Sequence, residues 1–224
     1  MPQHRPVLTG AVEEYLEAIH RLVAAGEAST TRLAEHLAVR PASVTGMLKR
    51  LADRGLIIYH PYGDIALTPD GQREALTIIR RHRLVERFLS DQLDMPLDRV
   101  HEEACRLEHA LSPELETRIA KKLGAPLACP HGHPIDARTS DNTIPLLEAP
   151  RGKPFVIARL EDESPEVIRY LTEQGLLPGT AITVADREPR EGALIIEVSG
   201  QRRTIGPGLA AGIRVSRPRR SNRT

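Results

Sequence analysis

The sequence predicts a mostly α-helical protein with additional β-structure, and three observations carry this prediction. Apolar residues recur at helical spacing from about residue 11 to residue 54 and are followed by a short hairpin pattern. Helical spacing then continues to about residue 123. Beyond residue 155 there are five short strand-like segments within about 60 residues, a density that is typical of a small SH3-like barrel.

Composition limits the kinds of protein this chain can be. Its 224 residues suffice for one large domain or two to three small ones, and its formal net charge of +1 means that any DNA-binding surface must be local. Two cysteines do not make a disulfide framework. Neither a signal peptide nor an apolar run of 18 or more residues is present, so we expect a cytoplasmic protein whose thiols stay reduced and available as ligands.

The N-terminal elements read as a winged helix-turn-helix. A helix is expected from Ala11 to about Ala25, followed by a short helix over 29–37, a tight connection over 38–40 and a second helix over 41–54 that starts at a proline. Two strands over 56–60 and 65–68 then form a wing. Such folds mostly bind DNA, although a protein-interaction module is the alternative.

The helix over 41–54 has two contrasting faces. Its apolar stripe includes Val44 and Leu48, whereas the opposite stripe is small or basic, so the backbone can approach base edges while lysine and arginine reach phosphates. The residues expected to contact DNA are Arg32, Arg40, Ala42, Ser43, Thr45, Gly46, Lys49 and Arg50.

Three helices follow, over 68–93, 97–109 and 112–123, and the second carries ligand-type side chains. With His101 at zero on a helical wheel, Cys105, Glu108 and His109 lie at about 40°, −20° and 80°. One face with four such groups predicts a transition-metal site, and the alternative is a solvated charged face with a chance cysteine. Three helices directly after a DNA-binding module also suggest dimerisation.

Two other groups of ligand-type residues have plainer interpretations. His82 and Glu86 are four residues apart on the long helix, a spacing equally suited to a surface ion pair. The segment Cys129-Pro-His131-Gly-His133-Pro resembles a small metal loop, but it offers no fourth ligand nearby and is rich in proline and glycine, which favours an ordered turn. The domains expected are 1–72 (DNA binding), 73–140 (metal binding and dimerisation), 141–154 (linker), 155–216 (SH3-like) and 217–224 (basic tail).

These motifs together resemble the diphtheria toxin repressor family of iron- or manganese-dependent transcriptional regulators. The resemblance covers nearly the whole chain and is most specific in Glu14-Tyr15-Leu16, Val44-Thr45, the run from Arg81 to Arg87 and the run from His101 to His109. The Cys129 loop also resembles the connector to the family's C-terminal barrel, in agreement with an ordered turn.

The resemblance implies two metal sites. The primary site would use Glu14, Cys105, Glu108 and His109. The ancillary site would use His82, Glu86 and His101, with an acid and an amide from the SH3-like domain. This chain has Glu161-Asp-Glu163 there without a glutamine, so Glu161 and Glu163 are weaker candidates.

The residue at position 14 bears on the choice of metal. Iron-type members have methionine there and manganese-type members have aspartate or glutamate, sometimes with a further glutamate that matches Glu17. A carboxylate in place of a thioether favours Mn(II), with Fe(II) as the alternative. Cys105, which is iron-like, would bind through its thiolate or its backbone carbonyl.

The expected function is a regulator, most simply a repressor of metal homeostasis genes, in which bound metal holds a homodimer in the geometry that binds operator DNA. Its recognition helices would lie about 34 Å apart, one turn of DNA. The alternatives are an iron-specific repressor of the same family and a metal-independent winged-helix regulator. An enzyme is not expected, because the chain has neither a nucleophile motif nor a metallohydrolase signature.

Overall fold

The computed structural model describes residues 8–60, 63–136, 142–188 and 192–218. Two compact units make up the chain: unit 1 comprises residues 1–82 and 106–111, and unit 2 comprises residues 83–105 and 112–224. The expected wing turn at 61–62, the first residue of the linker at 141 and the tail over 219–224 lie outside the described residues. Among the described helices, none has both the length and the apolar character that crossing a membrane requires.

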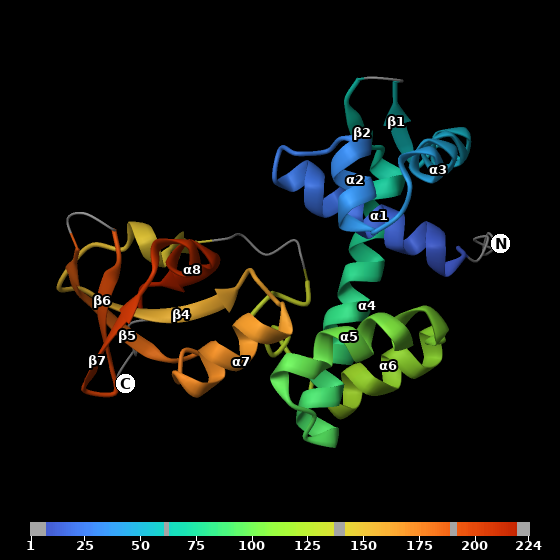
Figure 1. The fold of residues 1–224 in the computed structure, drawn as a ribbon. Coiled ribbons are helices and arrows are strands. Elements are labelled where there is room, and N and C mark those ends of the chain that lie inside the picture. Colours follow the sequence, from blue (N-terminus) through green and yellow to red (C-terminus); the bar gives the residue numbers. More distant parts are fainter. Residues whose placement is uncertain (1–7, 61–62, 137–141, 189–191, 219–224) are drawn as a thin grey trace. The chain divides into compact units, whose positions relative to one another are not determined.

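Unit 1 is the predicted winged helix-turn-helix (Figure 1). Leucine and isoleucine side chains from its three helices and the hairpin form one core, in which Leu16, Leu33 and Leu48 are completely buried. The Ser29 hydroxyl caps the second helix by accepting a hydrogen bond from the Arg32 amide at 3.2 Å. The elements are α1 (Gly10–Ala24), α2 (Thr30–His36), α3 (Pro41–Asp53), β1 (Ile57–Tyr59), β2 (Ile65–Leu67) and the first part of α4 (Pro69–Leu93).

The junction between the wing and α4 depends on a glycine. The Thr68 hydroxyl donates to the Gly55 carbonyl at 2.7 Å and accepts from the Gly71 amide at 3.1 Å. A β-carbon on Gly71 would lie only 2.8 Å from the carbonyl carbon of Leu56, which is shorter than any normal contact. The start of α4 can therefore lie against the backbone that leads into β1 only because residue 71 has no side chain.

The helical region differs from the prediction at one point. The helix α5 (Leu97–Leu107) ends before Glu108, and Glu108–Ala110 form the 3₁₀ turn η1. The four ligand-type residues that the sequence placed on one helical face therefore belong to two different elements. The reason is local, because the chain must turn before α6 (Pro113–Lys122), which begins at a proline and is capped by the Ser112 hydroxyl.

The C-terminal part of unit 2 is the predicted small β-domain, with one strand more than expected. Six antiparallel strands run in the order β3-β8-β4-β5-β6-β7. The extra strand comes from the expected linker, where Ile144 pairs with Val215 and the following Leu146 is completely buried. The elements are β3 (Ile144–Pro145), η2 (Leu146–Glu148), β4 (Pro154–Leu160), α7 (Pro165–Glu173), β5 (Ala181–Arg187), β6 (Leu194–Val198), β7 (Gln201–Ile205), α8 (Pro207–Gly212) and β8 (Ile213–Ser216).

Candidate metal centres and DNA-binding surface

The first centre lies in unit 1 around the imidazole of His109. Its Nε2 atom is 3.5 Å from Glu108 Oε1 and 3.9 Å from Glu14 Oε1. Glu14 comes from α1 and the other two residues come from η1. A β-carbon on Gly10 would lie 3.4 Å from the His109 ring, so the first turn of α1 packs closely against it. We use "first centre" for Glu14, Glu108 and His109.

His82 belongs beside the first centre. Its Nδ1 atom is 2.7 Å from Glu108 Oε2, and both side chains are buried. The two oxygens of the Glu108 carboxylate thus face two different imidazoles. The family resemblance implied that His82 serves the ancillary site, whereas this contact joins it to Glu108.

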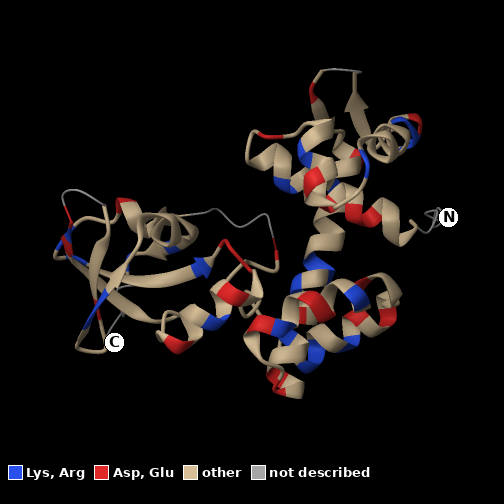
Figure 2. Ribbon diagram, viewed as in Figure 1, with Lys and Arg blue, Asp and Glu red and all other residues tan. Residues whose placement is uncertain are grey.

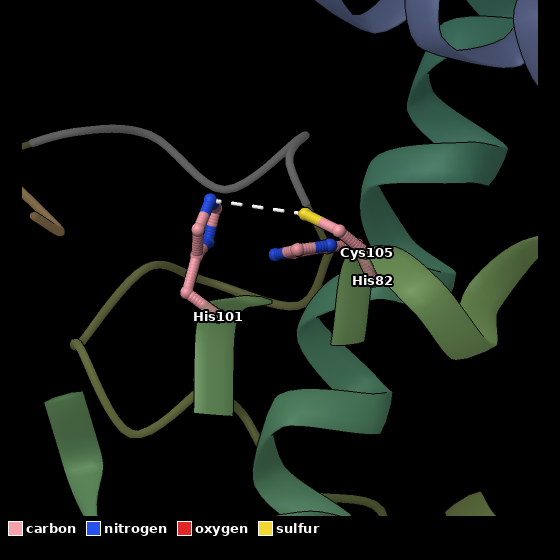
Figure 3. A group of neighbouring side chains, drawn as sticks. All are labelled: His82, His101 and Cys105. Carbon is pink, nitrogen blue, oxygen red and sulfur yellow. Dashed lines mark hydrogen bonds between the residues drawn. The ribbon is translucent and has the colours of Figure 1, made fainter. Parts of the chain in front are cut away.

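Two other residues expected near the first centre have different neighbours. The exposed Cys105 thiol lies 3.8 Å from His101 Nε2, one turn earlier on α5 (Figure 3), in unit 2 rather than unit 1. Glu17 lies one turn after Glu13 on α1 and forms an ion pair of 3.7 Å with Arg21. The first centre therefore consists of carboxylates and imidazole, which are oxygen and nitrogen donors.

The second centre lies in unit 2 around the buried carboxylate of Glu86. Its Oε1 atom is 3.2 Å from His101 Nδ1, and the same nitrogen is 2.9 Å from Glu163 Oε2. These three residues come from α4, from α5 and from the segment between β4 and α7. Three of the five residues named for the ancillary site, Glu86, His101 and Glu163, are therefore close together.

The Cys129 loop adds two residues to this centre. Ligand atoms of Glu86, Cys129 and His131 all lie within 4.8 Å of one another, and His131 Nδ1 is 3.3 Å from Glu86 Oε1. All three side chains are buried. The loop is also the ordered turn that the sequence favoured, since the Cys129 amide donates to the His133 carbonyl at 2.9 Å. We use "second centre" for Glu86, His101, Cys129, His131 and Glu163.

Backbone geometry brings this loop to the sheet. Gly132 has φ +92° and lies against the carbonyl of Ala158, where the pairing of β4 with β8 shifts register. The Leu160 amide donates to the His131 carbonyl at 2.9 Å, and His133 Nε2 is 2.8 Å from the Leu160 carbonyl. A residue without a side chain at 132 is thus a condition for the position of His131.

The second centre is strongly coupled electrostatically. Burial lowers the pKa of His101, but hydrogen bonds with Cys105, Glu163 and Glu86 outweigh it and raise the pKa to about 11. Burial raises the pKa of Glu163, yet its hydrogen bond with His101 brings the pKa down to about 2. The Cys129 thiol, buried and near the Glu86 and Glu163 carboxylates, has a pKa raised well above its usual value. Without metal, therefore, the positive charge of protonated His101 offsets the negative charge of the carboxylates at this centre.

Glu161 was also a candidate ligand of the ancillary site, but its carboxylate lies beside two arginines. Its Oε1 atom is 2.8 Å from Arg159 Nε and 3.9 Å from Arg214 Nε. Two guanidinium groups therefore neutralise this carboxylate, in contrast to the imidazoles around Glu163. The acidic segment offers Glu163 to the second centre and Glu161 to the surface of the sheet.

The predicted DNA-contact residues lie largely on the exposed side of the helix-turn-helix. Ala42, Ser43, Gly46, Lys49 and Arg50 are exposed on α3, whose basic positions are blue in Figure 2. Arg40 is exposed at its start, whereas Thr45 is half-buried and its hydroxyl donates to the Pro41 carbonyl at 3.2 Å.

Arg32, on α2, is already engaged by protein groups. Its Nη2 atom is 2.5 Å from Glu27 Oε2, and its Nη1 atom is 3.0 Å from Glu35 Oε2. A β-carbon on Gly46, by contrast, would have no atom within 4 Å, so the middle of the exposed face of α3 is open.

Comparisons with known protein families match three segments of the chain. Residues 7–65 match the N-terminal DNA-binding domain of iron-dependent repressors, 68–137 their metal-binding and dimerisation domain, and 144–217 the FeoA domain. The iron-dependent repressor IdeR of Mycobacterium leprae is 30% identical over 94% of this chain and 98% of its own length. This chain belongs to the iron-dependent repressor family. It is a metal-dependent, DNA-binding transcriptional regulator.

Other relatives include the diphtheria toxin repressor and repressors solved with bound manganese or cadmium. The diphtheria toxin repressor of Corynebacterium efficiens is 28% identical over 94% of this chain and 96% of its own length. A manganese-dependent transcriptional repressor solved with manganese is 32% identical, with a TM-score of 0.83 over 92% of this chain and all of the other. ScaR with bound Cd²⁺ is 29% identical, with a TM-score of 0.79 over 92% of this chain and 99% of the other.

The donor sets of both centres fit divalent metals. Bonds of about 2.0–2.2 Å to one ion leave two ligand atoms roughly 3–4 Å apart, as the atoms of the first centre are. The second centre adds a thiol to imidazoles and carboxylates, a softer set. Sequence reasoning did not assign Cys129 and His131 to a site, because their remaining ligands come from distant segments. A Cys-x-His pair next to two prolines was the available signal.

Proposed function

We propose that this protein is a repressor activated by Mn(II), which binds operator DNA as a homodimer and controls metal homeostasis genes. The observation that carries this proposal is the position of His109 Nε2 between the carboxylate oxygens of Glu108 and Glu14. Carboxylate oxygens are hard donors and favour Mn(II), whereas softer donors such as thiolates and thioethers favour other metals. The solved manganese-dependent relative supports the same metal, and the names of the iron-dependent relatives make Fe(II) the alternative.

Metal would act by joining α1 of the DNA-binding module to the turn that follows α5. The Glu14 side chain is 59% exposed on α1 and lies 3.9 Å from His109, while Glu108 is buried and held by His82. A bound cation supplies positive charge that attracts both carboxylates. Glu14 then fixes the orientation of α1, and with it the recognition helix α3, so that metal selects the conformation that binds it best.

The homodimer is supported by exposed apolar residues in unit 2. Leu93 is 57% exposed, Leu115 46% and Leu127 82%, all in or beside the region that matches the dimerisation domain. Large apolar side chains that stay exposed in such a domain are candidates for burial against a second copy of the chain. Sedimentation velocity with and without Mn(II) would measure the association, and a protein that stays monomeric at all concentrations would contradict the proposed dimer.

We further propose that the second centre binds a divalent metal and ties the Cys129 loop and the SH3-like domain to α4. Glu86, Cys129 and His131 are buried together, and Glu163 comes from the β-domain. Its thiol distinguishes it from the first centre, so Co(II) bound there should produce a thiolate charge-transfer absorption band. A Cys129→Ser variant that keeps this band in a Cys105→Ser background would contradict the assignment.

The experiment for the first centre measures metal-dependent DNA binding by the full chain. Duplexes selected from a randomised pool with Mn(II) serve as the probe, under anaerobic, reducing conditions. Glu14→Gln should raise the Mn(II) concentration needed for half-maximal binding by at least about tenfold, since one charged ligand is lost. Glu14→Met should shift the preference towards Fe(II), because a thioether is a softer donor.

Glu114→Gln is the matched control, because Glu114 is exposed on α6, where it forms an ion pair of 2.8 Å with Arg118. It should bind DNA with the wild-type metal dependence. Wild-type protein that binds the selected duplexes equally well with a chelator present would contradict the metal-activated function altogether.

A further inference from the structure

A buried carboxylate lies immediately beside the first centre. Glu13 and Glu14 are consecutive on α1, yet the Glu13 side chain is only 11% exposed, whereas the Glu14 side chain is 59% exposed. Glu13 Oε2 is 2.6 Å from His109 Nδ1, a shorter distance than those from His109 Nε2 to Glu108 and Glu14. The two carboxylates therefore approach the same ring from its two different nitrogens.

The other oxygen of Glu13 faces a guanidinium. Arg81 Nη1 lies 3.4 Å from Glu13 Oε1 and 3.3 Å from the Glu108 carbonyl, to which it donates. These side chains are largely buried, with 15% of Arg81 and 11% of Glu13 exposed. Arg81 thereby connects Glu13 to the η1 turn that carries Glu108 and His109.

We propose that Glu13 is a positioning residue, which sets the tautomer and orientation of His109 for metal binding. A carboxylate can only accept hydrogen bonds, so at 2.6 Å it holds the ring proton on Nδ1. The lone pair of the neutral ring then lies on Nε2, the nitrogen that faces Glu108 and Glu14. Such outer-shell carboxylates typically change metal affinity by about 10- to 100-fold.

Glu13 is distinguished from a metal ligand by its two contacts. Both oxygens are used, one by His109 Nδ1 and one by Arg81, and neither is directed to Nε2. This inference rests on the first centre of the proposed function, but the tautomer of His109 is a property of the metal-free protein. The two can therefore fail separately.

The isosteric variant Glu13→Gln gives the sharpest test. Arg81 and His109 Nδ1–H both donate to Glu13, and an amide has only one acceptor oxygen. If that oxygen accepts from Arg81, the amide NH₂ faces Nδ1 and stabilises the tautomer with the proton on Nε2. Glu13→Ala, which removes both contacts, should also lose the preference for Nδ1–H.

Two measurements on the full chain read this out. Long-range ¹H–¹⁵N spectra of metal-free protein, with His109 assigned through a His109→Gln variant, should show Nδ1–H in the wild type and Nε2–H in Glu13→Gln. Mn(II) affinity, measured from the electron paramagnetic resonance signal of the free ion, should fall by about 10- to 100-fold in the same variant. Glu35→Gln on α2, an exposed ion-pair partner of Arg32, should match the wild type in both.

Three results would overturn the positioning role. They are an Nδ1–H tautomer with unchanged Mn(II) affinity in Glu13→Gln, a wild-type spectrum that already has Nε2–H, and a loss of Mn(II) affinity in Glu13→Gln without any change of tautomer, which would make Glu13 a ligand. Thermal unfolding of each metal-free variant checks the fold, and should Glu13→Ala not fold, Glu13→Gln alone carries the test. A wild type with Nδ1–H that binds no Mn(II) would overturn the proposed function and leave the tautomer assignment standing.

Discussion

Substitution of Gly132 by alanine should disrupt the second centre and leave the first centre unchanged. Gly132 has φ +92°, and a β-carbon there would lie 2.7 Å from Arg159 Cα and 2.9 Å from the Ala158 carbonyl carbon. These atoms belong to the backbone of β4, which cannot move as a side-chain tip could. The Cys129 loop must therefore shift away from the strand, and His131 and Cys129 shift with it.

Two effects add up in this variant. An alanine in the left-handed region costs about 1–2 kcal/mol relative to glycine. Overpacking against fixed atoms costs a further 1–3 kcal/mol or so. We therefore expect a loss of about 3 kcal/mol in the free energy of unfolding of unit 2. The matched control is Gly124→Ala, because Gly124 has φ +71° with no atom within 4 Å of a β-carbon and should lose only the first part.

Urea unfolding followed by circular dichroism gives the stability, and hydrogen exchange by mass spectrometry localises the change. The Leu160 amide, which donates to the His131 carbonyl, should exchange faster in Gly132→Ala than in Gly124→Ala. In a Cys105→Ser background, Co(II) affinity at the second centre should fall by at least about tenfold. Equal stability and equal Co(II) affinity in the two alanine variants would refute the argument that the loop depends on this close approach.

Two further predictions concern DNA and protons. Gly46→Glu adds a negative charge to the open face of α3 and should weaken binding to the selected duplexes at least about tenfold. Gly46→Ala should instead stabilise the helix by up to about 1 kcal/mol. Undiminished DNA binding by Gly46→Glu would show that this face of α3 does not contact DNA. At pH 7 the pKa of about 11 for His101 and the raised pKa of Cys129 keep both groups protonated without metal. Metal binding at the second centre should therefore release protons, and its affinity should rise with pH; calorimetry in buffers of different ionisation enthalpy measures the release, and none would contradict the assignment.

The fold was predictable because its signals are local. Helical spacing, the proline at the start of α3 and the Ser112 cap each act within a few residues, and the predicted elements have the observed types. Two features were missed for the same reason. The two-residue strand β3 forms by pairing with β8, and the helix α8 has only six residues. Both elements are therefore too short to show an apolar periodicity of their own.

The sequence indicated which residues could bind metal better than it indicated which of them lie together. The sequence singled out Glu14, Glu108 and His109, which lie close together, through motifs that resemble those of a known family. The resemblance also assigned Cys105 to this site, and in the structure its thiol lies 3.8 Å from His101 Nε2. A helical wheel assumes an uninterrupted helix, and the change to a 3₁₀ turn at Glu108 removes that assumption.

By itself, the sequence determined the order of the elements and the supply of ligand-type side chains, and Glu14 led to the prediction of manganese. Tertiary structure alone decided which of two consecutive glutamates is buried against Arg81 and which is exposed beside His109 Nε2. It also decided that Cys129 and His131 lie next to Glu86. The physical reason is that metal centres depend on distances between side chains far apart in sequence, and packing sets those distances.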